Sequence, residues 1–269
     1  MRALLLLAVC STALAQGPAP DRVITYKEVH GDDLVLDVFL PDGWSASDRR
    51  PGMVLFFGGG WVGGDTAQFY PQARHLANLG IVAISAQYRT RNSHGTDPFT
   101  AVADGKSAMR WVRSHAAELG VDPGRILASG RSAGGHVAAC SVMVDGFDDP
   151  GDDLTVSPVP QALILFNPVL DTTERGYGTE KVGERKTEAS PTHLVRAGLP
   201  PTLVLHGTTD TVVPHENAER FCRLMTAAGN RCELESYEGQ IHGFFQHERG
   251  EEFFLKALHR TERFLRALG

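Results

Sequence analysis

The stretch ILASGRSAGGH, residues 126–136, indicates the architecture of this chain. Its first four residues are typical of a buried strand, and residues 132–143 are typical of a helix. Between them, Gly130-Arg131-Ser132-Ala133-Gly134 matches G-x-S-x-G, in which a serine sits on a sharp strand-to-helix turn with small neighbours. The pattern is weak in isolation because glycine and serine are common in turns, but the flanking strand and helix supply the context it needs. We therefore expect Ser132 to be an exposed nucleophile, with the N–H of Ala133 pointing at the reacting group.

Strands and helices alternate on both sides of this turn. Strands are expected at residues 23–29, 34–40, 53–57, 81–86, 126–129, 162–166, 202–205 and 234–237, with Gly31-Asp32-Asp33 as the first turn. Helices are expected at residues 67–78, 99–119, 132–143, 216–228 and 251–268. The alternation predicts an α/β fold, a mostly parallel sheet of about eight strands with helices on both faces, in one domain of residues 21–269.

Two segments interrupt this alternation. Residues 145–160 are acidic and contain prolines, so they are expected to form a surface loop. Residues 171–196 form a charged insertion between two strands. Ligands of such sheets bind at the carboxyl ends of the strands, so the insertion is in a position to overhang a site there.

A serine nucleophile needs a base, and the base needs an orienting carboxylate. Asp210 follows the strand at 202–205 and His242 follows the strand at 234–237, so both lie at the same sheet edge as Ser132. Their chain order, Ser then Asp then His, is the order that this kind of strand-to-helix serine uses. We therefore expect Ser132, Asp210 and His242 to form a catalytic triad. Two alternatives remain open: His247 as the base, and Glu238 or Asp171 as the acid. The other nearby histidines are not expected to be catalytic. His206 is expected to hold its loop by a hydrogen bond, and His136 lies on the helix after the serine.

A run of three glycines, Gly58-Gly59-Gly60, directly follows the expected strand at 53–57. Glycines here allow backbone N–H groups to approach a ligand closely and to point at it. A flexible loop is the plainer interpretation, but so tight a glycine run costs backbone entropy and lies where a second anion-stabilising donor belongs. We expect Gly59, Gly60 and Ala133 to form an oxyanion hole, with Trp61 beside it.

Composition excludes several classes of partner. Hydrophobic residues make up 42% and charged residues 22% of the chain, which is ordinary for a folded protein. The net charge is −6 and no run of Lys or Arg stands out, so neither nucleic acid nor an anionic membrane is an expected partner. No cluster of His, Asp and Cys has metal-ligand spacing, so neither a metal nor another cofactor is expected.

The first fifteen residues resemble a signal peptide. Arg2 supplies the positive start, Ala3 to Val9 form an apolar run, and Ala13-Leu14-Ala15 is a small-x-small cleavage site. The apolar run is too short to span a bilayer. We expect cleavage after Ala15 and a mature protein that is secreted or periplasmic and not attached to a membrane.

Removal of this leader leaves three cysteines. Cys222 lies on an expected helix and Cys232 starts the next strand, with Gly229-Asn230 as the turn between them. In an oxidising compartment this turn can bring the two thiols together, so a disulfide is expected. Cys140 lies in an apolar helical stretch and is expected to be a buried free thiol.

Taken together, these residues resemble the α/β-hydrolase superfamily, in particular the acetyl esterase/lipase branch related to hormone-sensitive lipase. The resemblance covers nearly the whole mature chain. The branch carries a His-Gly-Gly-Gly oxyanion motif, which Phe57-Gly58-Gly59-Gly60 matches with Phe in place of His. Gln87-Tyr88-Arg89 is similar to the family's Asp-Tyr-Arg. The resemblance implies the α/β-hydrolase fold and a buried structural pair of Arg89 and Asp104.

The resemblance also implies an activity. Members of this branch hydrolyse carboxylic esters, often short-chain ones, without a cofactor, and many exported relatives remove acetyl groups from plant polysaccharides. The expectation is a secreted serine carboxylesterase that forms an acyl-enzyme on Ser132 and acts on acetyl-type esters, either small or polysaccharide-linked. Trp61 and Phe244 are expected to bound a small substrate pocket.

Three other functions fit the sequence less well. A serine peptidase of the prolyl-oligopeptidase type shares the triad order, but too few residues precede the strand at 53–57 to build the β-propeller that such enzymes carry. A true lipase is disfavoured because the insertion at 171–196 is charged and makes a poor apolar lid. A non-catalytic binding protein on the same fold is disfavoured by the complete triad and glycine loop.

Overall fold

Side chains of strand β3 (Arg50–Phe56) show why the sheet is covered on both faces. Val54 and Phe56 point into one hydrophobic core, whereas Met53 and Leu55 point into a second core on the opposite face. A strand that is apolar on both faces must be buried on both, which is why it forms a continuous apolar run in the sequence.

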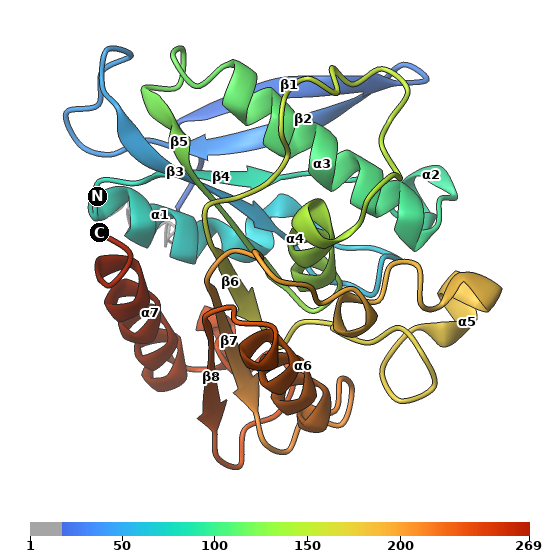
Figure 1. Cartoon of the computed structure of the whole chain (residues 1–269). Coiled ribbons are helices and arrows are strands. Elements are labelled where there is room, and N and C mark those ends of the chain that lie inside the picture. Colours follow the sequence, from blue (N-terminus) through green and yellow to red (C-terminus); the bar gives the residue numbers. More distant parts are fainter. Residues whose placement is uncertain (1–17) are drawn as a thin grey trace, which may run out of the picture.

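The structure, a computed structural model, describes residues 18–269 and contains one eight-stranded sheet in the order β1-β2-β4-β3-β5-β6-β7-β8 (Figure 1). Strand β2 runs antiparallel to β1 and β4, and the remaining neighbours are parallel. This confirms the mostly parallel sheet predicted from the sequence. The other strands are β1 (Arg22–Val29), β2 (Asp32–Phe39), β4 (Val82–Ala86), β5 (Val121–Arg131), β6 (Leu163–Phe166), β7 (Thr202–Gly207) and β8 (Cys232–Tyr237).

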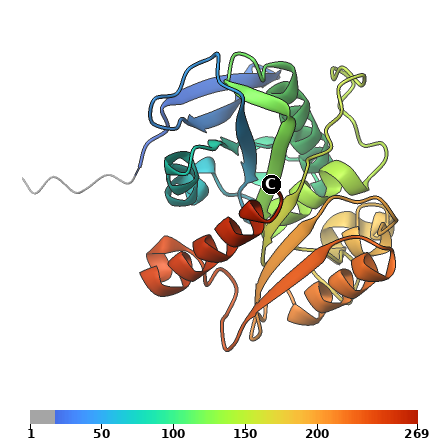
Figure 2. The ribbon, with the colours of Figure 1, turned by 60° about the vertical axis from the view of Figure 1, so that its left-hand side comes forward.

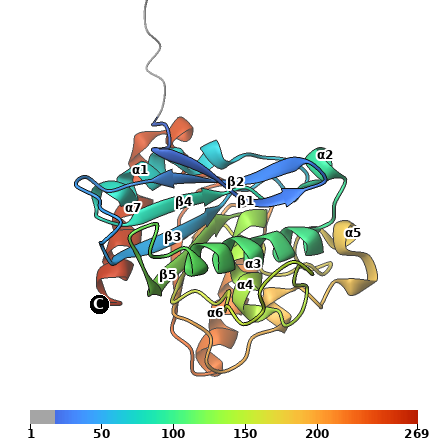
Figure 3. The same ribbon diagram turned by 90° about the horizontal axis from the view of Figure 1, so that it is seen from above.

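Helices form a layer on each face of the sheet. Helices α1 (Tyr70–Asn78) and α7 (Glu251–Arg266) cover one face, and α7 lies in front of the sheet in Figure 2. Helices α3 (Pro98–Ser114), α4 (Ala133–Met143) and α6 (His215–Ala227) cover the other face, as Figure 3 shows from above. The short helices α2 (Arg91–His94) and α5 (Thr179–Val182), which were not predicted, lie outside these layers.

Several predicted boundaries differ from the structure. Strand β5, expected at residues 126–129, spans Val121–Arg131, and the helix expected at 67–78 begins as a short 3-10 turn before α1. The first turn consists of His30 and Gly31, both with positive φ (53° and 88°), so Asp32 and Asp33 pair within β2 instead of turning. A two-residue turn with positive φ at both positions follows the natural twist of a hairpin. The helix expected at 99–119 ends at Ser114, and residues 115–120 form turns.

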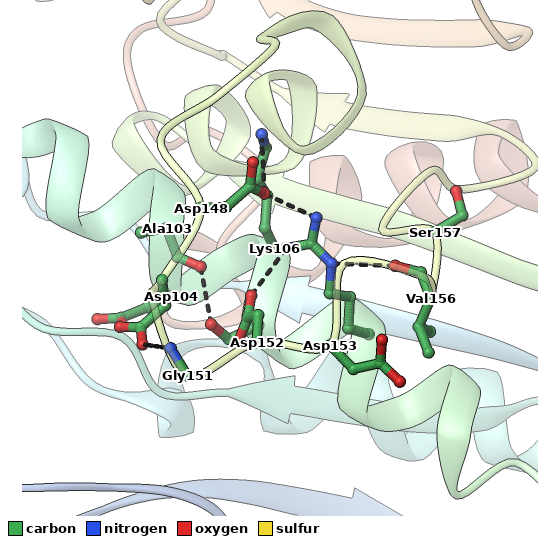
Figure 4. A network of polar contacts seen from close by, with 12 residues as sticks. Ala103, Asp104, Lys106, Asp148, Gly151, Asp152, Asp153, Val156 and Ser157 are labelled. Atoms are coloured by element: carbon green, nitrogen blue, oxygen red, sulfur yellow. Dashed lines mark hydrogen bonds and ion pairs between the residues drawn. The ribbon is translucent and has the colours of Figure 1, made fainter.

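The acidic segment 145–160 is a surface loop, as predicted, but it is anchored by ion pairs (Figure 4). Arg110 of α3 lies 2.7 Å from both Asp148 and Asp152, and Lys106 lies 3.3 Å from Asp148. These contacts hold an irregular acidic segment against a basic stretch of α3.

Arg89 and Asp104 form the buried pair that the resemblance implied. Asp104 is fully buried, and both of its oxygens accept bonds from the Arg89 guanidinium, at 2.8 and 2.7 Å. Hydrogen bonding to Asp104 raises the pKa of Arg89 even though burial opposes it. Lys27 of β1 adds a third contact at 2.8 Å.

The cysteines adopt the expected arrangement. A disulfide joins Cys222 of α6 to Cys232 of β8, with 5.3 Å between their Cα atoms. Cys140 is a buried free thiol, and burial raises its pKa. Within residues 18–269 no helix is long and apolar enough to cross a membrane. The expected signal peptide, residues 1–15, lies outside the described residues.

Candidate active site

Ser132 occupies the sharp turn between β5 and α4. Its φ of 52° and ψ of −121° are strained for a residue with a side chain. Two glycines make the turn possible: a Cβ on Gly130 would overlap the backbone of Gly134, and a Cβ on Gly134 would overlap the carbonyl oxygens of Phe56 and Phe57. The G-x-S-x-G spacing is therefore a packing requirement, and it brings the start of α4 against the end of β3.

A chain of hydrogen bonds joins the three residues expected to form the triad. His242 Nε2 lies 3.0 Å from Ser132 Oγ, and His242 Nδ1 lies 2.7 Å from Asp210 Oδ2. Asp210 and His242 come from the loops after β7 and β8, and parallel strands bring those loops to one edge of the sheet. With Nδ1–H donating to the carboxylate, Nε2 is left as the acceptor for the serine proton.

The Asp210 carboxylate is held by four donors. Its Oδ1 accepts the backbone N–H groups of Val212 and Val213, each at 2.9 Å. Its Oδ2 faces His242 and, at 3.2 Å, His206 Nε2. Burial alone would raise the pKa of Asp210, but the hydrogen bonds from His206, His242 and Val213 outweigh it and hold the pKa well below its usual value. Asp210 is therefore an ionised group that orients His242.

The structure places the competing residues in other roles. His206 holds its loop by a 2.9 Å bond to Val213 O, as expected. His136 bonds Ala189 O at 2.6 Å, and burial lowers its pKa to about 4. The ring of His247 packs on Phe254, and Asp171 pairs with Arg220 instead of with a histidine. Within residues 18–269 no group of three or more His, Cys, Asp or Glu residues is arranged to hold a metal ion.

The glycine loop after β3 turns sharply beside the strand-to-helix turn that carries Ser132. Gly59, Gly60 and Trp61 all have positive φ (135°, 63° and 59°), and Gly59 O accepts the N–H groups of Val62 and Gly63. Ala133 is the first residue of α4, where backbone N–H groups point out of the helix and the helix dipole favours negative charge. The structure thus brings Gly59, Gly60 and Ala133 to the same part of the sheet edge as Ser132.

Two residues that sequence reasoning missed hold this loop. The Gln68 side chain accepts the N–H of Gly58 at 3.0 Å and donates to its carbonyl at 3.3 Å. The Tyr88 hydroxyl donates to Phe57 O at 2.8 Å, and its ring stacks on that of Phe57, with 4.1 Å between the ring centres. Gln68 and Tyr88 therefore fix the loop although Phe57 stands where the family motif has His.

The charged insertion at 171–196 contacts the glycine loop. A Cβ on Gly60 would lie 2.6 Å from the Tyr177 hydroxyl and 3.2 Å from Lys181 Nζ. Lys181 donates to Tyr177 at 2.7 Å, so the bonded pair packs against Gly60. A cavity of about 340 Å³ opens beside it. The lining of this cavity is mixed: five of its residues are polar or charged, namely Arg91, Thr96, Asp97, Glu180 and Lys181, and the others include Trp61 and Val62.

The two residues expected to bound the substrate pocket have different surroundings. Trp61 lines the cavity although it is only 2% exposed, and its ring packs edge-on against His136. Phe244 is 3% exposed and its ring packs against Tyr237, Phe245 and Phe253. Phe244 is therefore a core residue on the α7 side of the sheet, because the turn after His242 directs its ring into that core and away from the expected pocket wall.

Asn167 is a further residue that sequence reasoning missed. It directly follows β6 and is fully buried, with its side chain between His242 and Gly243. The available signal was its position at the carboxyl end of an apolar strand next to β5, the strand that carries the nucleophile.

Comparison with known proteins identifies the family. A family model described as "BD-FAE" matches residues 36–164, and that of the dienelactone hydrolase family matches residues 163–268. Carboxylesterase NlhH of Mycobacterium tuberculosis is 31% identical over 236 residues, which are 79% of this chain and 71% of NlhH. The probable carboxylic ester hydrolase LipM of the same organism is 30% identical over 76% of this chain, and the match spans only about half (51%) of LipM.

Solved structures agree with this assignment. Esterase 2 of Thermogutta terrifontis, phosphoramylated by tabun, superposes with a TM-score of 0.89 at 48% identity, covering 92% of this chain and 94% of that one. The same esterase has been solved with propionate and with butyrate bound. The chain therefore belongs to the α/β-hydrolase carboxylesterases, in the branch related to hormone-sensitive lipase.

Proposed function

We propose that this chain is an exported serine carboxylesterase that hydrolyses short-chain esters of polar alcohols, acetyl esters of sugars above all, through an acyl-enzyme on Ser132. The observation that carries the proposal is the hydrogen-bonded chain from Ser132 through His242 to Asp210, beside a glycine loop.

In the first half-reaction Ser132 Oγ attacks the ester carbonyl while His242 Nε2 takes the serine proton. Asp210 stabilises the resulting imidazolium, and the N–H groups of Gly59, Gly60 and Ala133 are the proposed donors to the oxyanion. When the tetrahedral intermediate collapses, the C–O bond to the alcohol breaks and His242 returns its proton to the departing alcohol. The acyl group remains on Ser132.

In the second half-reaction a water molecule attacks the acyl-enzyme. His242 takes a proton from this water, and the second tetrahedral intermediate forms against the same N–H donors. Collapse releases the carboxylic acid and returns the proton to Ser132 Oγ. No cofactor enters either half-reaction.

The cavity beside Gly60 adjoins the glycine loop and is not lined by the triad residues themselves, but its size and polarity favour a short substrate. Its volume of about 340 Å³ is at the small end of the range for ligand sites, and four of its lining residues carry charges. Charged walls disfavour a long acyl chain, because burying apolar surface there leaves polar groups without hydrogen bonds. The propionate and butyrate complexes of the Thermogutta esterase are consistent with a short acyl group.

Export rests on two further features. Residues 1–15 resemble a signal peptide, and the disulfide between Cys222 and Cys232 is typical of proteins from oxidising compartments. Sequencing the N-terminus of the protein purified from culture medium or periplasm tests this, with Gln16 as the expected first residue.

Replacement of the nucleophile tests the reaction. Ser132→Ala should lower kcat on p-nitrophenyl acetate by several orders of magnitude and abolish labelling by a fluorophosphonate probe, with unchanged thermal unfolding. Ser141→Ala, the same change further along α4 at a residue that bonds only Ala138 O, is the matched control. Full activity in purified Ser132→Ala protein would end the proposal.

An ester series tests the substrate class. The value of kcat/KM on p-nitrophenyl esters should peak at acetyl to butyryl and fall sharply by octanoyl. A roomy apolar site would instead gain about 0.8 kcal/mol for each added CH₂. Acetylated xylan and acetylated pectin then test for a sugar alcohol. A maximum at octanoyl or longer would contradict the short-chain proposal and favour a lipase.

A further inference from the structure

Backbone hydrogen bonds hold Asn167 and its neighbour from two sides. Asn167 follows β6, its N–H donates to Leu205 O at 2.7 Å, and the N–H of Ser132 donates to the preceding residue, Phe166, at 3.0 Å. Its φ is 34°, in the left-handed region that asparagine tolerates better than most residues. Its side chain is completely buried, so the position is held both from β7 and from the nucleophile turn.

The side-chain amide of Asn167 has only one possible orientation. The backbone N–H of Gly243 can only donate, and it lies 3.1 Å from Asn167 Oδ1. The NH₂ group must therefore point the other way, and Nδ2 lies 3.4 Å from His242 Nε2. Asn167 thus binds the loop that carries the base through one atom and faces the base itself through the other.

This orientation distinguishes the two protonation states of His242. Neutral imidazole with a proton on Nδ1 has a lone pair on Nε2, and that lone pair faces both the Ser132 hydroxyl and the Asn167 N–H. Imidazolium carries a proton on Nε2, which would face the Asn167 N–H group. The amide therefore favours the neutral form, which is the form that removes a proton from serine or water.

We propose that Asn167 is a positioning residue that fixes the His242 ring and keeps it neutral, so that the esterase remains active at lower pH. The proposal rests on the proposed role of His242 as the base. Asn167 touches no reacting atom of the ester in this scheme and acts through His242 alone.

Other ionisable groups also surround His242, and the test leaves all of them in place. Asp210 bonds Nδ1, and His206 shares the same Asp210 oxygen. On the side of Gly243, Arg249 Nε lies 3.7 Å from the position a Cβ would take. Three further charged or titratable groups lie in the next layer. The ring of His215 packs on that of His206, and Arg131 lies over the ring of Phe245. Glu248 is an acidic neighbour of Arg131.

The variant Asn167→Asp separates this role from a structural one. Aspartate has the same size, still accepts the Gly243 N–H, and replaces only the NH₂ group with a carboxylate oxygen. A carboxylate this close to Nε2 stabilises imidazolium, so the acid limb of kcat/KM on p-nitrophenyl acetate should move up by about 1–3 pH units. Asn78→Asp, at an exposed position at the end of α1, makes the same change in net charge and should leave the acid limb in place.

Fluorophosphonate labelling of Ser132 provides a second readout that needs no turnover. If Asn167→Asp turns over too slowly to assay, the pH dependence of its labelling rate should show the same upward shift. Thermal unfolding checks that the variant is folded, and a destabilised Asn167→Asp protein is assayed below its unfolding temperature. A wild-type acid limb in both kcat/KM and labelling would overturn the role of Asn167. Full activity of Ser132→Ala would instead overturn the proposed function, so the two failures are distinguishable.

Discussion

Substitution of Asp104 by Asn should strongly lower the free energy of unfolding although Asp104 lies outside the catalytic site. Its fully buried carboxylate accepts the Arg89 guanidinium at 2.8 and 2.7 Å, the Arg89 backbone N–H at 3.0 Å and Lys27 Nζ at 2.8 Å. Asn in its place keeps the size of the side chain but removes the charge. Its NH₂ group must then face one of these donors.

The size of the stability loss follows from the two cations that the substitution leaves without the Asp104 carboxylate. Arg89 and Lys27 are only 15% and 13% exposed, so Asp104→Asn leaves two poorly hydrated cations without their main partner. Breaking a buried ion pair in this way costs about 3–5 kcal/mol. Asp149 remains 2.5 Å from Lys27 and 3.4 Å from Arg89, so we expect the lower end, about 3 kcal/mol. At about 2–4 °C per kcal/mol, the unfolding temperature should fall by roughly 6–12 °C.

Urea unfolding and differential scanning calorimetry measure this loss. The control is Asp145→Asn, which makes the same change in an ion pair whose carboxylate is 95% exposed and 3.8 Å from Arg196. That variant should lose no more than about 1 kcal/mol, because solvent screens the pair. If the two variants lose equal amounts, the network around Asp104 contributes nothing beyond a surface pair and the reasoning is wrong.

Three further predictions concern other parts of the fold. Replacing Cys222 and Cys232 with serine should lower the free energy of unfolding by roughly 2–3 kcal/mol; two thiols that alkylate freely in the unreduced native protein would contradict the bridge. The variant Gly134→Ala should lose most esterase activity, because its Cβ would overlap the carbonyl oxygens of Phe56 and Phe57. The control Ala138→Gly, in the same helix, should retain activity and lose only about 1 kcal/mol of stability. Because the pKa of Asp210 is lowered by folding, its ionised form contributes stability above its unfolded pKa, near 3.9, and that contribution disappears as the pH falls. The stability of the wild type relative to Asp210→Asn should therefore decrease as the pH falls from about 4 to 2 in urea titrations, and a relative stability that increases over this range would refute the assignment.

The parts of this protein that depend on short-range patterns were predictable. Apolar runs separated by helical segments predicted the parallel sheet, because burial on both faces requires continuous apolar strands. The G-x-S-x-G spacing predicted the strand-to-helix turn, because only glycine fits where Gly130 and Gly134 pack against backbone. The positions of Asp210 and His242 at strand ends predicted that they would meet, because parallel strands bring their carboxyl ends to one edge.

Contacts between loops that are far apart in the sequence could not be predicted from short-range patterns. Asn167 and Gly243 are 76 residues apart; both follow strands and so reach the same sheet edge, but nothing in either local sequence indicates that the Asn167 amide bonds the Gly243 N–H. The same holds for Gln68 holding the glycine loop and for Tyr177 and Lys181 packing against Gly60. Phe244 shows the converse: its neighbour His242 was correctly placed at the sheet edge, but the direction of its own ring depended on the aromatic core beneath α7. Local sequence specifies which groups reach the sheet edge, whereas their orientation there is set by long-range packing and hydrogen bonds that form only when the chain is folded.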